Sequence, residues 1–196
     1  RWGLVESFVR AWFSRPFEAG DGFRDAALRD AERRLKRPLP ASVREWFALG
    51  GVRFETLFDD NYYLTRPEEL EVSEGLLQVY AEGQGAGIYG IRAADLDLDD
   101  PPVYEASLPR KPDVPTFSAF VFDLLLNERV ETRGSANPRR DGEVMTAWVH
   151  GPALRRAMEE AFWPLPMPAW SPFSARKHTR WFGDGETLVR VDRDEW

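Results

Sequence analysis

The chain of 196 residues has a net charge of −7 at pH 7, and 43% of its residues are hydrophobic. This length suits one domain, and the apolar side chains suffice for a core without covalent cross-links. The sequence contains no cysteine, which excludes disulfides, thiol nucleophiles, thiolate zinc sites and iron–sulfur clusters. The longest apolar run, residues 117–126, is about half of the roughly 20 residues that a membrane span needs. We therefore expect no membrane segment.

Three helices are predicted in the first fifty residues. Apolar residues recur at helical spacing over residues 2–13, 23–35 and 41–49. Asp21 is a plausible cap for the second helix. Gly50 or Gly51 is expected to end the third helix in a left-handed conformation.

Short strands are predicted in the middle of the chain, where the helical spacing ends. The predicted strands cover residues 53–58, 62–64, 76–81, 87–92 and 102–105, with a helical turn at 67–70. Glycines at positions 83, 85 and 87 favour a tight hairpin between the two longest of these strands.

The last third of the chain is predicted to combine helices with a terminal hairpin. A helix over residues 116–128 is expected to be capped by Thr116. Its predicted buried stripe is Phe117, Phe120, Val121, Leu124 and Leu125. Further predicted elements are a strand at 143–149, a helix at 151–162, a stiff proline-rich connector at 164–168 and a hairpin over 180–191. This order of elements indicates an α+β fold with a central, largely antiparallel sheet flanked by helices.

Acidic residues are concentrated in the middle of the chain. Residues 55–105 contain thirteen Asp and Glu but only two Arg, a net charge of −11. The other residues contain twenty acidic and twenty-four basic side chains, a net charge of +4. Such a field repels nucleic acid and attracts a basic partner, but a hydrated acidic face also serves solubility. The charge distribution alone leaves both interpretations open.

Motifs that would indicate catalysis or ligand binding lack the context they require. Residues 85–90 fit G-x-G-x-x-G but lie between two predicted strands, whereas a dinucleotide site needs a helix after the glycines. Residues 95–100 begin like a calcium loop, but Asp100 and Ala106 stand where an EF-hand has Gly and Glu. The two histidines, His150 and His178, belong to no ligand motif. We expect no metal, no cofactor and no enzymatic activity.

Several short motifs follow one another in a particular order. They are residues 31–40 with the Leu39-Pro40 step, 43–51 with two closing glycines, 76–85, 89–91, the Asp100-Pro101-Pro102-Val103 run with Tyr104, and 116–120. Together these motifs resemble the signature of the SUKH superfamily, also called SMI/KNR-like. The resemblance covers about residues 23–128.

The resemblance implies an α+β domain whose motif residues build the fold and which has no catalytic residues. The superfamily includes bacterial immunity proteins that neutralise toxins by direct binding, and eukaryotic regulators of cell-wall synthesis and signalling. It therefore implies an immunity protein, and the absence of cysteine leads us to expect a cytoplasmic location. The implied partner is a cognate protein toxin, such as a basic nuclease, and neither nucleic acid nor a membrane is an expected partner.

We expect the toxin to dock on an acidic face of the sheet region. The candidate contacts are Glu71, Glu74, Glu82, Asp95, Asp97, Asp99 and Asp100, with Tyr80, Tyr89 and Tyr104 as aromatic anchors. One alternative is a regulatory or scaffolding protein that binds a host partner. A second alternative is an enzyme with an unrecognised site, which converging carboxylates of perturbed pKa in a cleft would favour.

The predicted organisation is a single domain over residues 1–196. Residues 1–20 are expected to form an N-terminal helical extension, residues 21–163 the SUKH-like core, and residues 164–196 the proline-rich connector and C-terminal hairpin.

Overall fold

The computed structural model describes residues 1–57, 61–84, 87–107, 112–131, 152–167, 179–183 and 187–192. The chain divides into two compact units, residues 1–140 and 141–196. We expected the core to extend to residue 163, whereas the structure groups the helix at 152–161 with the C-terminal strands. The predicted strand at 143–149, the two histidines and the basic residues Arg139 and Arg140 lie outside the described residues.

The described residues of the first unit include the helices α1 (Gly3–Trp12), α2 (Asp25–Leu35), α3 (Ala41–Gly50) and α4 (Phe117–Glu131). Each was predicted from its apolar spacing, and α4 continues three residues beyond its predicted end. Thr116 caps α4 as expected, since its Oγ1 accepts a hydrogen bond from the Ala119 amide at 3.2 Å. The predicted stripe of α4 is buried, and so are Asp123 and Asn127 on its other sides. This helix is therefore central to the core.

The sheet of the first unit is antiparallel throughout. Its strands are β1 (Thr56–Leu57), β2 (Tyr62–Leu64), β3 (Val72–Ser73), β4 (Leu76–Glu82), β5 (Ile88–Arg92) and β6 (Tyr104–Glu105). The strand order is β1-β2-β4-β5-β6, and β3 pairs with β4 as well. Helices and a mainly antiparallel central sheet confirm the predicted α+β class.

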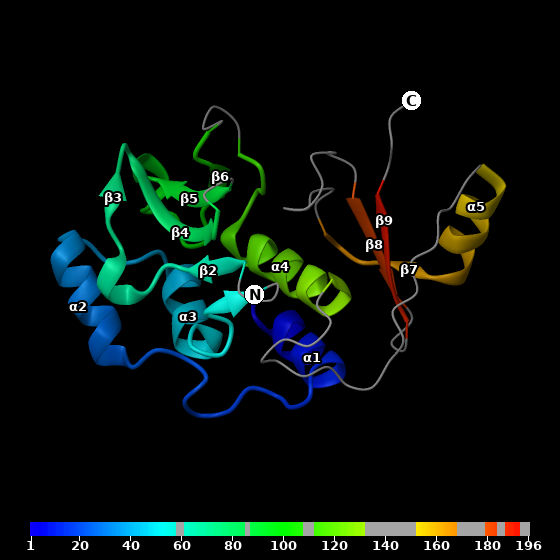
Figure 1. The fold of residues 1–196 in the computed structure, drawn as a ribbon, viewed down its shortest axis with the longest axis horizontal. Coiled ribbons are helices and arrows are strands. Elements are labelled where there is room, and N and C mark those ends of the chain that lie inside the picture. Colours follow the sequence, from blue (N-terminus) through cyan, green and yellow to red (C-terminus); the bar gives the residue numbers. More distant parts are fainter. Residues whose placement is uncertain are drawn as a thin grey trace. The chain divides into compact units, whose positions relative to one another are not determined.

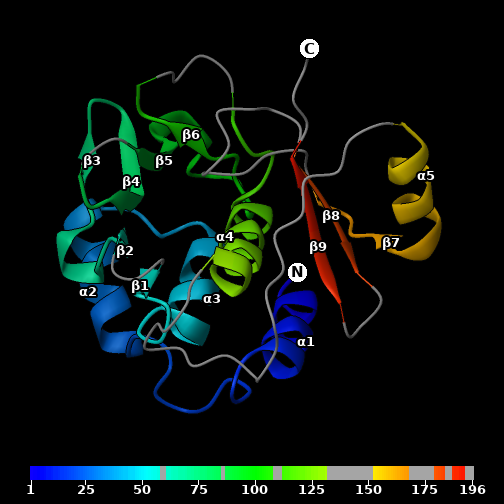
Figure 2. The same ribbon diagram turned by 45° about the vertical axis from the view of Figure 1, so that its right-hand side comes forward.

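The two faces of this sheet differ in what covers them. In both views α2 and α3 lie below strands β3, β4, β5 and β6, and α4 lies beside these strands (Figure 1, Figure 2). The helix-facing side presents Leu77, Val79 and Tyr80, all fully buried, because an irregularity between Gln78 and Tyr80 turns two consecutive residues inward. The other side is called the open face here. Register and alternation place on it Tyr63, Leu76, Gln78, Ala81, Ile88, Gly90, Arg92 and Tyr104.

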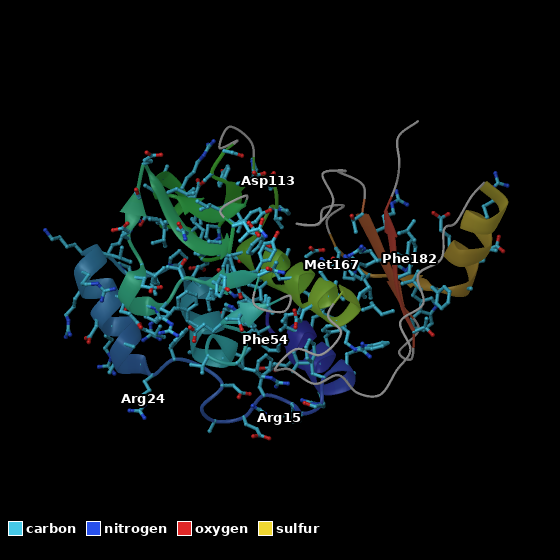
Figure 3. All side chains as sticks on the ribbon, in the orientation of Figure 1. Arg15, Arg24, Phe54, Asp113, Met167 and Phe182 are labelled. Atoms are coloured by element: carbon cyan, nitrogen blue, oxygen red, sulfur yellow. The ribbon has the colours of Figure 1, made fainter. Side chains whose placement is uncertain are left out.

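Asp21 does not cap α2, contrary to the prediction. The residue before α2 is Arg24, and no side chain caps that end. Asp21 is instead buried and accepts two hydrogen bonds from the Arg15 guanidinium at 2.6 and 2.7 Å. Arg15 lies in the segment between α1 and α2 (Figure 3). The backbone carbonyl of Asp21 also accepts the amides of Val52 and Arg53, so this residue joins that segment to the end of α3.

The glycines that end α3 are not left-handed, which corrects a second prediction. Gly50 is the last helical residue, and Gly51 has a right-handed φ of −58°. The left-handed helix end is at Lys36 after α2, with a φ of 56°. Close packing explains the two glycines: a Cβ atom would lie 2.7 Å from the Phe17 ring at Gly50 and 2.7 Å from the Phe23 ring at Gly51.

The second unit contains α5 (Pro152–Ala161) and an antiparallel sheet of β7 (Trp163–Pro164), β8 (Thr179–Gly183) and β9 (Leu188–Asp192). The order of these strands is β7-β8-β9, with the predicted terminal hairpin formed by the last two. Trp181 and Phe182 of β8 are buried. The predicted stiff connector begins as strand β7, where Pro164 pairs with Phe182 at the sheet edge, a position that tolerates proline.

Candidate functional site

The three predicted aromatic anchors are buried, so they offer no surface to a partner. Tyr80 is fully enclosed, and its hydroxyl donates to the carbonyl of Phe54 at 3.3 Å. Tyr89 packs on Phe120 with ring centroids 5.4 Å apart. Burial raises the pKa of both tyrosines far above the ordinary value, which keeps them as neutral members of the core.

Tyr104 is the third of these tyrosines and lies under an arginine on the open face. The guanidinium carbon of Arg92 is 4.2 Å from the centre of the Tyr104 ring. The Tyr104 hydroxyl donates to Asp95 Oδ2 at 3.0 Å, and burial together with this hydrogen bond raises the pKa of the phenol. The predicted contacts Tyr104 and Asp95 are therefore bound to each other within the fold.

The remaining acidic residues of the loop at 95–100 contact the ends of helices. Asp97 pairs with Arg37 at 2.6 Å, just beyond α2. The backbone carbonyl of Asp99 accepts the amide of Ser42, in the first turn of α3, at 2.8 Å. Asp100 accepts the Ser118 amide at 3.0 Å and the Ser118 hydroxyl at 2.5 Å, at the start of α4. This acidic run has structural roles that its composition did not indicate.

Glu74 and Glu82 lie at opposite ends of the sheet. Glu74 belongs to the turn between β3 and β4, where it has a φ of 51° and is followed by Gly75 with a φ of 78°. Glu82 ends β4 and is paired with Tyr62 on the helix-facing side. At about 3.3 Å per residue, β4 separates the two ends by about 20 Å. The structure therefore does not bring the ten predicted contacts together on one surface.

Glu71, one of the predicted contacts, lines a hollow in the sheet. The hollow has a volume of about 240 Å³ and is lined by Tyr63, Leu64, Thr65, Glu69, Glu71, Ser73, Gln78 and Ala81. It exists because β2 and β3 pair with the same edge of β4 (Figure 1). The chain between them leaves the edge of β4 through the 3-10 turn Pro67–Glu69, where the Pro67 carbonyl accepts a hydrogen bond from Arg34 of α2. We call this feature the β2–β3 hollow.

The rim of the β2–β3 hollow is acidic, and its wall is aromatic. Glu69 and Glu71 are exposed, and the described residues provide no ion pair for either of them. One Glu69 oxygen accepts the Arg66 amide at 3.3 Å, in the capping box of the 3-10 turn. The Arg66 side chain is instead paired with Glu55. Tyr63 is 42% exposed, on the side of the strand opposite to buried Tyr62 and Leu64. An exposed aromatic side chain beside unneutralised carboxylates can contact both the apolar and the charged part of a cation.

Sequence reasoning identified Glu71 but missed the other residues of the hollow. Tyr63, Ser73 and Gln78 come from three strands, and Thr65 directly follows β2; these residues meet only through the strand register. The one available signal was the alternation in the predicted strand at 62–64, which places Tyr63 on the side opposite to its two neighbours.

The described residues contain no group of three His, Cys, Asp or Glu side chains that could hold a metal ion. None of the helices in the described part of the chain combines the length and hydrophobicity needed to cross a bilayer. Comparison of the chain with protein-family models, with curated proteins and with solved structures found no match.

Proposed function

We propose that this chain is a cytoplasmic, non-enzymatic protein of the SUKH type that neutralises a cognate toxin by binding to it directly. The observation that carries the proposal is the location of the negative charge. The segment with a net charge of −11 builds the central sheet, and that sheet has an open face with an exposed tyrosine. At its edge lie two exposed carboxylates for which the described residues provide no ion pair. A surface of this kind favours a basic protein partner.

The chemistry of a toxin inhibitor fits this arrangement. Toxins that act on nucleic acid carry basic surfaces, because they must neutralise phosphates. An acidic protein surface competes for those basic side chains and accelerates the encounter by long-range attraction. The predicted consequence is an association rate that falls steeply as the salt concentration rises.

The proposed function is tested by capture followed by rescue. The tagged protein is used to isolate partners from its native organism, and each captured domain is then expressed in a heterologous host with and without this chain. We expect one captured domain to be lethal alone and harmless when co-expressed. Recovery of partners that are not toxic, or toxicity that co-expression leaves unchanged, would contradict the proposal and favour a scaffolding role.

Charge-reversal variants test whether the rescue depends on the acidic surface. Reversing Glu69 and Glu71 to Lys should slow association with the captured toxin and weaken protection. The matched control is Glu6→Lys, an exposed acid on α1 outside the acidic segment, which should protect like the unmodified protein. Equal protection by all variants, at equal expression, would show that another surface binds the toxin.

A further inference from the structure

The open face of the sheet already holds one guanidinium on a tyrosine. Tyr104 is paired with Gly90, and Arg92 is the next residue of β5 on the same side. The arginine covers the ring at 4.2 Å and leaves Tyr104 only 5% exposed. This is a cation–π contact reinforced by the carboxylate of Asp95, which accepts the hydrogen bond of the Tyr104 hydroxyl.

Tyr63 has a similar setting on the same face but lacks the cation. It is paired with Ala81, which places its ring on the open face like Tyr104. It is 42% exposed, and no described arginine or lysine covers it. Two carboxylates, Glu69 and Glu71, line the same hollow. The Thr65 hydroxyl also belongs to this wall, and its oxygen is buried without a hydrogen-bond partner.

From this geometry we propose that the β2–β3 hollow is the receptor for an arginine side chain presented by the partner protein. The guanidinium stacks on Tyr63 while its N–H groups donate to Glu69 and Glu71. The proposal rests on the proposed function, since it names the contact through which a basic partner is held.

The size of the hollow and the two carboxylates that line it favour arginine over lysine. Its volume of about 240 Å³ is below the roughly 300–1,000 Å³ of pockets that enclose a drug-sized ligand, and it suits a single side chain. A planar guanidinium stacks on an aromatic ring and donates to two carboxylates at once. A lysine ammonium is a strongly hydrated point charge and does not stack in this way.

The test is a titration that does not require the toxin. The full chain is titrated with N-acetyl-arginine amide, and the backbone amide signals are followed by heteronuclear NMR. N-acetyl-citrulline amide, which has the same shape without the charge, is the control ligand. We expect saturable shifts at Tyr63, Ser73 and Gln78 with the arginine compound and none with the citrulline compound. The double variant Glu69→Gln with Glu71→Gln, and separately Tyr63→Leu, should lose these shifts.

Glu74→Gln is the matched control variant, because this exposed acid lies in the β3–β4 turn and does not line the hollow. It should keep the response to arginine, and the spectrum itself reports that each variant is folded. Shifts that are spread over the acidic loop at 95–100, or that persist in the double variant, would overturn the proposal. Local arginine binding without any rescued toxin would leave the hollow as a site and contradict the immunity role alone.

Discussion

Asp21 shows how a single carboxylate can organise a part of the chain without regular structure. It binds Arg15, accepts the Glu18 amide at 3.0 Å, and lies 3.6 Å from the guanidinium of Arg53. The Arg53 side chain is only 5% exposed and lies 5.1 Å from the ring centre of Phe54. Arg53 and Asp21 therefore form a buried charge pair beside aromatic rings.

Replacing Asp21 by Asn should lower the free energy of unfolding by about 3 kcal/mol, because it removes one partner of a buried charge pair. Asp25→Asn is the control, since Asp25 makes exposed pairs with Arg29 and Arg44 and should matter far less. Urea denaturation of both variants measures the difference. Equal stability of the two variants would show that the buried carboxylate has no special role.

The contribution of Asp21 should depend on pH in a defined direction. The hydrogen bond from Arg15 holds the pKa of this carboxyl below its ordinary value. Because the pKa is lower in the folded state than in the unfolded state, the ionised carboxylate stabilises the fold above about pH 4. This stabilisation is lost as the pH falls through the lowered pKa. The stability difference between the protein and its Asp21→Asn variant should therefore shrink in acid. A difference that stays constant down to pH 2 would contradict this linkage.

The element that depends most on a distant residue is α4. Its first turn is held by Asp100, which is seventeen positions before the first residue of the helix, Phe117, and accepts two hydrogen bonds from Ser118. The Thr116 hydroxyl accepts a third hydrogen bond, from the Ala119 amide. Since α4 is buried on several sides, its start determines how the central helix meets the sheet.

Asp100→Ala should lower the free energy of unfolding by about 1–2 kcal/mol, because it leaves the helix start without its charged acceptor. Asp97→Ala removes an acid of the same loop whose side chain is 90% exposed, and it should change stability by less than about 0.5 kcal/mol. Thermal denaturation compares the two variants. A larger effect of Asp97→Ala would refute the structural assignment of Asp100.

The helices and long strands could be predicted because their apolar periodicity is local. The burial of Tyr80 was missed for a reason that is also physical. The irregularity at Gln78 in β4 turns both Val79 and Tyr80 inward, and simple alternation cannot anticipate it. The acids at 95–100 were predicted to form a binding surface because composition shows their charge. It does not show the groups of the fold that Asp95, Asp97 and Asp100 contact, which are Tyr104, Arg37 and Ser118. The β2–β3 hollow depends on two strands sharing one edge, which is a tertiary property.

At the scale of the whole molecule, the division at residue 140 was not predicted. The sequence placed the last boundary at residue 163 because prolines follow it, yet one of them belongs to an edge strand. The first unit contains its own aromatic core, in which Trp46 stacks on Trp2 and Phe54. The second unit has 56 residues by this division, close to the size at which a single core is only marginally stable.

A fragment of residues 1–140 should therefore fold without the rest of the chain. We expect it to retain the near-ultraviolet circular dichroism of packed aromatic rings and a cooperative thermal transition. The complementary fragment, residues 141–196, should show neither when it is isolated. Loss of the cooperative transition in the longer fragment would show that the two units stabilise each other.

The shortness of the outer strands affects how the protein behaves at high concentration. The central sheet is bounded by β1 and β6, each two residues long, and the β4 edge is shared by β2 and β3 with a 3-10 turn between them. A long, straight strand edge would template pairing with other molecules, whereas short and interrupted edges expose few adjacent backbone donors and acceptors. The interruption that creates the hollow thus also protects the sheet against edge-to-edge aggregation.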